Sequence, residues 1–386
     1  MRLGISYNSL IMALTLMLLI NIPFVPQTMN NLFILSIEAL YILLIRSISF
    51  RVVKQNKSIL LFALTIVGCT FLNLGLSTRT ANALVTAIRY ILLFYSVTYF
   101  AKKKLLHNFI STFICFLSIM IFIADLSIVV TLFTKGISEH GGAYNSYIIG
   151  NKFTVSYYHM FFLGLYQVEL MKWKKQEILG FCILSLASVI ICYIIECNTG
   201  IIGCVIVILI RIISKFNNPL IRILAKPSVF CMVFISINYL FLGTGFLTTE
   251  SFIVDLLRKF SHTSTILTGR YEMYIISIRA FLESPIIGYG INSTVVEDIL
   301  TWGNPQNGLL KILLDYGIMG AIAFLSVCYH SLKTKNSTII HNSIRYGLLS
   351  FLYSMSICSL VEININSLFI IACALYSATV KNDSLV

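Results

Sequence analysis

Long uninterrupted runs of apolar residues, separated by short polar segments, recur along the whole chain. The runs are about 20 residues long, the length an α-helix needs to cross a hydrocarbon core of about 30 Å. They are continuously apolar rather than alternating, which favours helices over the strands of a membrane barrel. We therefore predict an all-α polytopic membrane protein with about twelve transmembrane helices, at residues 9–25, 31–50, 58–76, 80–100, 108–131, 153–171, 177–195, 199–213, 228–246, 309–330, 345–361 and 364–380.

The composition agrees with this prediction. Of the 386 residues, 58% are hydrophobic and 11% are charged, whereas soluble proteins have about 25% charged residues. The first run follows Met1-Arg2, as in a signal peptide, but Pro23 and Pro26 close it and no small-x-small cleavage site follows. We expect this run to be the first spanning helix, and residues 1–386 to form a single integral membrane domain.

The net charge of +13 is a topology signal rather than evidence for nucleic-acid binding. With the N-terminus placed in the cytoplasm, the basic clusters fall on alternate loops on the inner side, examples being Lys102–Lys104 and Lys172–Lys175. This is the positive-inside pattern. We expect both termini in the cytoplasm, the lipid bilayer as a partner, and no nucleic acid.

Metal and cofactor chemistry receive no support from the sequence. The ten cysteines lie within or at the ends of apolar runs, with no spacing typical of a zinc site or a disulfide framework. The six histidines form no metal-binding set. His140, beside two glycines in an outer loop, is the one we consider a candidate substrate contact, and His159 looks incidental.

Two predicted outer loops are longer than the others, namely 135–152 and 247–308. The second carries most of the charge on the outer side, and a long loop of this kind is where surface chemistry is commonly housed. It includes a predicted amphipathic helix that starts at Thr268 or Gly269 and stops at Pro285. Glu272, Arg279 and Glu283 share one face of this helix.

Three arginines invite either a functional or a structural interpretation. Arg270 stands at the start of the predicted outer helix, where a guanidinium and free backbone N–H groups suit a phosphate. Arg279 either binds substrate or pairs with Glu283. Arg89 lies near the middle of a predicted span, where an unpaired cation is costly; it either pairs with Asp125 or Glu38, or reaches a lipid diphosphate.

The segment from Gly269 to Gly320 resembles the signature of the O-antigen polymerase and O-antigen ligase superfamily. It reads Gly269-Arg270, then Pro285-Ile286-Ile287-Gly288-Tyr289-Gly290, then Gln306-Asn307-Gly308, then Asp315-Tyr316-Gly317-Ile318-Met319-Gly320. In that family an Arg precedes Pro-x-x-Gly-x-Gly, followed by His-Asn and by an acidic residue with Gly-x-x-Gly. The chain departs from the pattern at Gln306, which replaces the family His. In the loop 135–152, which carries an Arg in polymerases with paired Arg-bearing loops, only Lys135 and Lys152 are available.

The resemblance implies a membrane glycosyltransferase with a GT-C-like architecture and one large extracytoplasmic loop. Such enzymes join polyprenyl-diphosphate-linked oligosaccharides at the outer face of the bacterial cytoplasmic membrane, without a metal or other cofactor. Other members of the pathway, a flippase and a chain-length regulator, would be partners. On this basis the predicted catalytic residues are Arg270, Arg279, Glu272, Gln306 and Asp315, with Glu272 and Glu283 the lower-ranked acid–base candidates. The predicted substrate-binding residues are Asn307, Gly288, Gly290, Arg89, His140 and Lys152.

Two rival functions remain open at this point. An O-antigen ligase would transfer the finished polysaccharide to a lipid A core, and the substitution of the family His by Gln306 counts against it. A polysaccharide flippase or other transporter would show repeat symmetry and a charged central cavity. The chain shows no internal repeat, and its polar residues gather in one outer loop.

Overall fold

The computed structural model describes residues 6–20, 26–44, 56–134, 146–166, 175–216, 219–247, 270–300, 304–333 and 339–381. Within these ranges the chain is helical apart from short turns and one small antiparallel hairpin. In chain order the elements are α1 (Tyr7–Met17), α2 (Gln27–Leu44), α4 (Lys57–Leu74), α5 (Thr78–Lys102), α6 (Leu106–Thr134), β1 (Ser146–Tyr147), β2 (Gly150–Asn151), α7 (Lys152–Leu165), α8 (Lys175–Ile194), α9 (Asn198–Lys215), α10 (Pro219–Leu224), α11 (Pro227–Leu247), α13 (Arg270–Glu283), α14 (Val295–Leu300), α15 (Gly308–Leu332), α16 (Ile339–Cys358) and α17 (Ser367–Lys381).

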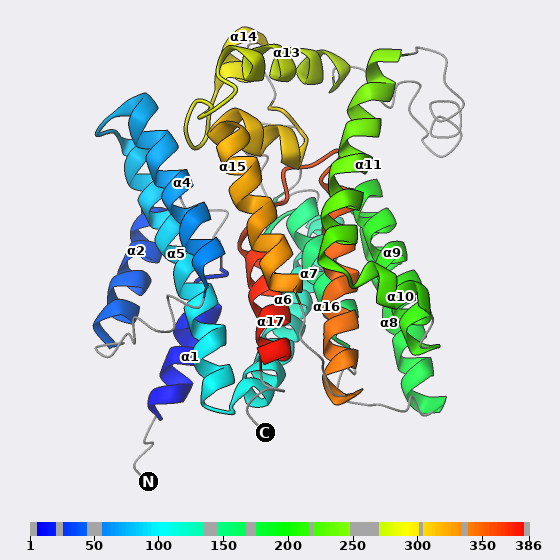
Figure 1. Ribbon diagram of the computed structural model, residues 1–386. Helices are drawn as coiled ribbons and strands as arrows, with labels where there is room; N and C mark the ends of the chain where they lie inside the picture. The colour runs from blue at the N-terminus through cyan, green and yellow to red at the C-terminus, as the bar shows by residue number, and fades with distance from the viewer. Residues whose placement is uncertain are drawn as a thin grey trace.

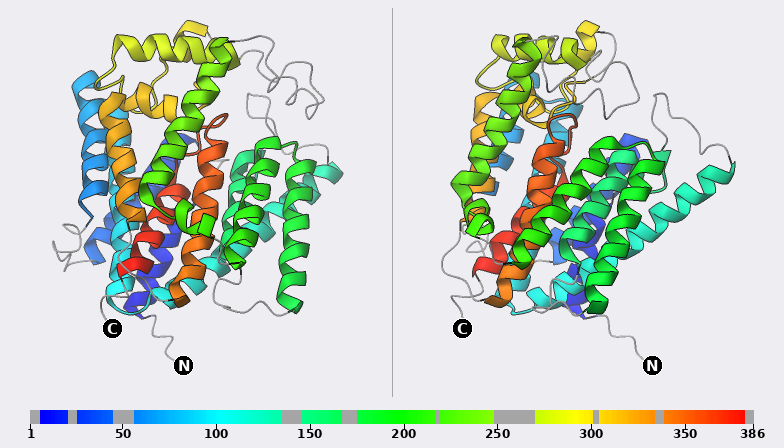
Figure 2. Two further views of the ribbon diagram at one scale, coloured as in Figure 1. Left: turned by 45° about the vertical axis from the view of Figure 1, so that its right-hand side comes forward. Right: turned by 90° about the vertical axis from the view of Figure 1, so that its right-hand side faces the viewer.

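Most of these helices stand side by side in one bundle (Figure 1). Helices α13 and α14 instead lie across one end of the bundle, while α1 begins and α17 ends at the opposite end. Figure 2 shows α7, α8 and α9 standing together beside α16, and α16 packs extensively against α9, α7 and α17. We call the end that carries α13 the outer end, following the orientation predicted from the basic residues.

The fold class agrees with the prediction. Each of the twelve predicted spans overlaps a helix. By length and composition alone, five helical segments in the described ranges are long and apolar enough to cross a membrane: Lys57–Leu74, Thr78–Lys102, Leu106–Val130, Asn198–Lys215 and Gly308–Leu332. Shorter apolar helices accompany them. The protein is thus an all-α, multi-pass membrane protein, and the count of twelve spans stays a prediction.

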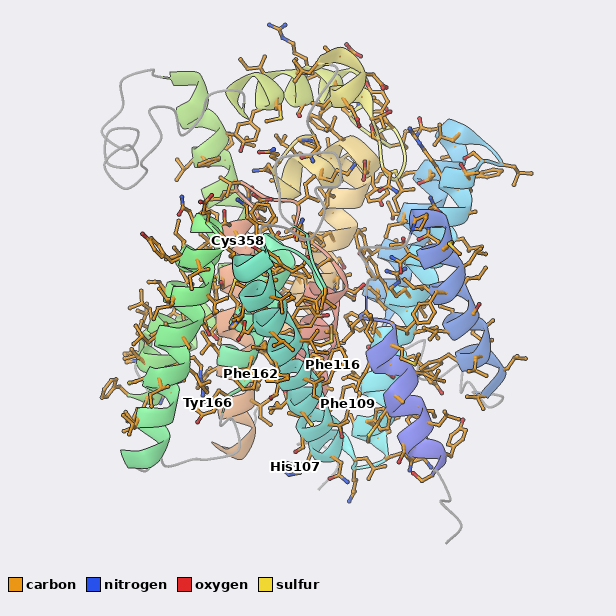
Figure 3. The ribbon with its side chains drawn as sticks, turned by 180° about the vertical axis from the view of Figure 1, so that it is seen from behind. His107, Phe109, Phe116, Phe162, Tyr166 and Cys358 are labelled. Carbon is orange, nitrogen blue, oxygen red and sulfur yellow. The ribbon has the colours of Figure 1, made fainter. Side chains whose placement is uncertain are left out.

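A column of aromatic rings fastens four helices together. Phe100 of α5 stacks on Phe109 of α6 with 4.9 Å between ring centroids, and Phe113 meets Phe161 of α7 edge-on at 5.1 Å. Phe161 in turn stacks on Phe351 of α16 at 4.0 Å. Figure 3 shows this side of the molecule, with Phe109 and Phe116 on α6. Within a membrane the hydrophobic effect does not drive helices together, so packing contacts such as these ring pairs stabilise the bundle.

Small residues allow α9 to approach its neighbours closely. A Cβ added at Gly200 would lie 2.3 Å from Ser156 Oγ of α7, and one at Gly203 would lie 2.6 Å from Met160 Sδ. Such small-residue contacts are typical of helix pairs in membranes. Helix α9 begins at Asn198, one residue before the predicted span 199–213.

Helix α15 is interrupted at Gly317, whose backbone has φ 62° and ψ −161°. In a continuous helix the amides of Ile318 and Met319 would donate to the carbonyls of Leu314 and Asp315. Here they donate to Pro285 O (2.8 Å) and Ile286 O (3.2 Å) in the loop that follows α13. The two carbonyls left free in α15 accept instead from Tyr289 N (2.7 Å) and Gly290 N (2.8 Å).

Four hydrogen bonds between the loop and α15 therefore replace two within the helix. We call the residues 285–290 the docking loop. Since an unpaired backbone group costs free energy when it is removed from water, the interruption in α15 and the docking loop depend on each other. Glycine is required on both sides, because a Cβ at Gly317 would lie 2.2 Å from Ile286 O and one at Gly288 would lie 2.4 Å from Leu314 O.

We predict that Gly317→Ala destabilises the protein. The backbone conformation of Gly317 is nearly exclusive to glycine and would cost alanine about 1–3 kcal/mol before any clash. The measurement is the temperature at which the detergent-purified protein loses its monodisperse peak. Gly68→Ala in α4 is the matched control, since a Cβ there meets nothing within 4 Å. Equal thermal midpoints for the two variants would contradict the proposed dependence on the docking loop.

Candidate functional site

The predicted outer helix exists as α13, which begins at Arg270 and ends at Glu283, just before Pro285. Its buried side holds Met273, Tyr274, Ser277 and Ala280, whereas Arg279 and Glu283 are exposed. Met273 and Ala280 belong to a small apolar cluster with Val296 of α14 and Leu314 of α15. The helix therefore rests on these two elements and presents Arg279 and Glu283 outward, together with the exposed Leu282.

The two arginines of α13 lie on opposite sides of the helix axis. They are nine positions apart, which is about two and a half helical turns. Arg270 occupies the same side as Tyr274 and Ser277, which are buried, although its side chain and that of Glu272 lie outside the described residues. Arg279 is on the exposed side, and the structure shows no ion pair between it and Glu283 within the described part of the chain.

Tyr274 connects α13 to two other segments. Its hydroxyl lies 3.2 Å from Leu360 O, in the loop between α16 and α17, and 3.5 Å from Gln306 O. Gln306, which stands where the family has His, has a positive φ of 40° and is half-buried. The structure thus brings Gln306 together with the side of α13 on which Arg270 lies.

Asn307 is fully buried, and its side chain is used by the fold. Its Oδ1 accepts from Leu310 N at 2.9 Å, which caps α15, and its Nδ2 donates to Asn238 Oδ1 of α11 and to Leu360 O, both at 3.1 Å. A single amide therefore caps one helix and joins it to α11 and to the loop between α16 and α17. These contacts give Asn307 a positioning role, through which it holds Gln306 in place.

Asp315 is buried and is held by groups close to the docking loop. Its Oδ1 accepts from Lys311 Nζ at 2.9 Å and from Ser293 N at 3.1 Å. Lys311 also lies 3.4 Å from Ser293 O. The carboxylate therefore neutralises Lys311 and fixes the turn that follows Gly290.

Tyr289 fastens the docking loop to α13. Its hydroxyl donates to Ala280 O at 2.8 Å and lies 3.3 Å from Glu283 Oε2. Burial and the neighbouring Glu283 carboxylate raise the pKa of the Tyr289 phenol above its ordinary value. The predicted residues Gly288 and Gly290 lie on either side of Tyr289, where their amides donate to Ser284 O and Asp315 O.

The remaining predicted residues lie away from this region or outside the described residues. Arg89 of α5 is paired with Glu38 of α2, with 4.0 Å between Nε and Oε1, so of the two predicted ion-pair partners Glu38 is the one the structure shows. Lys152 begins α7 and donates to Glu196 O at 3.1 Å. His140 falls outside the described residues.

The structure also brings together residues that the sequence did not indicate. His159 of α7, which looked incidental, lies 3.1 Å from Asp125 Oδ1 of α6 through Nε2 and 3.1 Å from Ser188 Oγ of α8 through Nδ1. Glu362 is a half-buried carboxylate two residues beyond Leu360. No sequence motif marks either group, because their surroundings are created by helices distant in sequence.

The segment that contains this site matches a known family. The family described as O-antigen ligase matches residues 183–325. The predicted resemblance to the O-antigen polymerase and ligase superfamily is confirmed. The matched segment runs from within α8 to within α15 and includes α13, the docking loop, Gln306 and Asp315. No curated protein matches the chain.

The O-antigen ligase match supports a general class of function for the chain. Members of this family are membrane enzymes that act on polysaccharide, so the match supports an activity of the O-antigen ligase or polymerase type in surface polysaccharide synthesis. Both types are consistent with the match.

We predict that Asn307→Ala lowers stability. It removes a helix cap, at a cost of about 1 kcal/mol, and leaves Asn238 Oδ1 without its donor in a buried position, which costs about 1–3 kcal/mol more. Thermal midpoints of the purified protein provide the measurement. The matched control is Asn108→Ala, an exposed asparagine of α6. A normal midpoint for Asn307→Ala together with lost activity would show instead that Asn307 acts on substrate.

Proposed function

We propose that the chain polymerises oligosaccharide repeat units linked to polyprenyl diphosphate, at the outer face of the bacterial cytoplasmic membrane. The observation that carries this proposal is the placement of α13. It lies across the outer end of the bundle (Figure 1), with Arg270 at its start and Arg279 on its exposed side. A lipid-linked diphosphate sits at the membrane surface, the level at which such a helix lies.

In the proposed reaction a sugar hydroxyl of the acceptor attacks the anomeric carbon of the donor. The new C–O bond forms as the bond to the diphosphate breaks, and polyprenyl diphosphate leaves with the bonding electrons. Arginines suit this leaving group, because a guanidinium binds phosphate oxygens through two parallel hydrogen bonds. Arg270 and Arg279 lie on opposite sides of α13, so each would contact the diphosphate or its flanking groups separately.

The hydroxyl proton of the acceptor needs a base. Gln306 has no basic side chain, and Asp315 is already held by Lys311 and Ser293. Among the acidic candidates Glu272 lies on α13, and Glu362 follows Leu360 by two residues in the loop where the Leu360 carbonyl accepts from Tyr274 and Asn307. We assign the base to Glu362, because its half-buried position beside this junction combines access with a fixed backbone.

The first prediction from this proposal concerns Arg270. Arg270→Ala should abolish polymer while single lipid-linked units remain at the outer face, because one lost charge-stabilising group typically lowers the rate about 100- to 1,000-fold. A gel of surface polysaccharide distinguishes a ladder of chains from a single unit. Arg270→Lys should restore part of the ladder, and Arg222→Ala on α10 is the matched control.

Three outcomes would redirect the assignment. A normal ladder in Arg270→Ala would remove Arg270 from the site. Single units accumulating on the cytoplasmic face of a deletion strain would make the protein a flippase. If the same deletion strain made polymer of normal length that is not attached to a lipid A core, the protein would be a ligase.

The second prediction concerns Glu362. Glu362→Gln should lower the polymerisation rate about 100- to 10,000-fold, the usual contribution of a general base, while the amount of folded protein stays unchanged. Rates are measured with purified protein and lipid-linked repeat units. Glu297→Gln, an exposed carboxylate on α14, is the control. If Glu362→Gln retained the wild-type rate and Glu272→Gln lost it, the base would be Glu272.

A further inference from the structure

Arg79 contacts the turn that follows the docking loop, although it is distant in sequence. It is the second residue of α5, and its Nη2 donates to Thr294 Oγ1 at 3.1 Å. The Thr294 hydroxyl in turn donates to Asp298 Oδ2 of α14 at 3.0 Å. A half-buried guanidinium from another part of the bundle is thereby placed beside the matched segment, at the outer end.

The stability of α5 does not explain why an arginine stands at position 79. A cation in the first turn of an α-helix opposes the helix dipole and is mildly unfavourable. The start of α5 is already capped by Ser77, whose hydroxyl accepts from Thr80 N at 3.2 Å. Within the described part of the chain no carboxylate lies within 4.0 Å of the Arg79 guanidinium, and its contact is a neutral hydroxyl. Most of its five N–H donors are not used in this contact.

The surroundings of Lys311 can be compared with those of Arg79, because Lys311 contacts the same turn, formed by Ser293 and Thr294. Its Nζ lies 3.4 Å from Ser293 O, next to Thr294, and 2.9 Å from the Asp315 carboxylate. Two cations thus flank Ser293 and Thr294, one from α15 and one from α5. Asp315 neutralises Lys311 directly, whereas the carboxylate linked to Arg79, Asp298, is reached only through the Thr294 hydroxyl. Of the two cations, Arg79 is therefore the one without a direct carboxylate partner in the described part of the chain.

The turn between these cations is held firmly in place. Ile291 N donates to Thr70 Oγ1 of α4 at 3.0 Å, and Ser293 N donates to Asp315. A Cβ at Gly290 would lie 3.2 Å from Thr70 Cα, so the loop backbone lies directly against α4. A site built on this turn would be rigid, and its position relative to α13 is fixed by the docking loop.

We propose that Arg79, positioned by the Thr294 hydroxyl, forms a second phosphate-binding subsite, which holds the diphosphate of the second lipid-linked unit. This inference rests on the proposed function, because polymerisation brings two polyprenyl diphosphates to the enzyme at once. One would be bound at α13 and the other beside Arg79. The same phosphate chemistry is present in anionic lipid headgroups, so the experiment has to separate these two sources.

The test is calorimetric titration of the full chain, purified in detergent, with farnesyl diphosphate. The wild-type protein should bind two molecules. Arg79→Ala should weaken one of the two binding events about 10-fold or more, because charge-assisted hydrogen bonds are lost, and leave the other unchanged. Arg79→Lys should lie between these extremes. Lys102→Ala, an exposed cation at the opposite end of α5, should behave as wild type.

Each further outcome decides the question. Unchanged binding in Arg79→Ala would overturn the subsite, and so would a loss confined to phosphatidylglycerol when the titration is repeated in nanodiscs with and without that lipid. The proposed function fails separately, if the wild-type protein makes no polymer from lipid-linked units. Normal polymer together with unchanged binding in Arg79→Ala would overturn the second subsite alone.

Discussion

The exchange of hydrogen bonds between α15 and the docking loop is the constraint on which the outer end of the protein depends. A helix that enters a membrane normally satisfies its own backbone groups. Helix α15 cannot do so at Gly317, and the loop that follows α13 supplies both the missing acceptors and the missing donors. These hydrogen bonds therefore fix the path of the loop from the end of α13 to Ser293. The positions of Tyr289, Ser293 and Thr294 follow from that path.

This constraint gives the glycine-rich motif a steric explanation. Gly288 and Gly317 face each other's segments so closely that a Cβ on either would meet backbone atoms of the other segment. Both also have positive φ values, which glycine adopts at no steric cost. In this protein Pro-x-x-Gly-x-Gly and the following Gly-x-x-Gly form a joint between two segments. The chemistry falls to the side chains that this joint positions.

The sequence was sufficient to predict the helices and the limits of α13. It was insufficient to predict which side chains contact one another. Continuous apolar runs and an outer helix closed by Pro285 are local signals, so they could be read directly. Whether Arg89 pairs with Glu38 or Asp125 depends on how α2, α5 and α6 pack, and no local pattern reports that. The same holds for Arg79 with Thr294 and for His159 with Asp125 and Ser188, because each contact joins elements distant in sequence.

The distribution of charge around the docking loop separates a structural pair from the cations that remain for substrate. Asp315 is buried and satisfied by Lys311 and by the Ser293 amide, so this pair holds the turn and carries little net charge. Arg279 is exposed, and Arg79 contacts only a hydroxyl in the described part of the chain. Guanidinium groups keep their charge at every physiological pH and match the geometry of phosphate oxygens. The fold thus neutralises Lys311 internally and leaves Arg79 and Arg279 at the outer end, where a lipid-linked diphosphate would meet them under the proposed function.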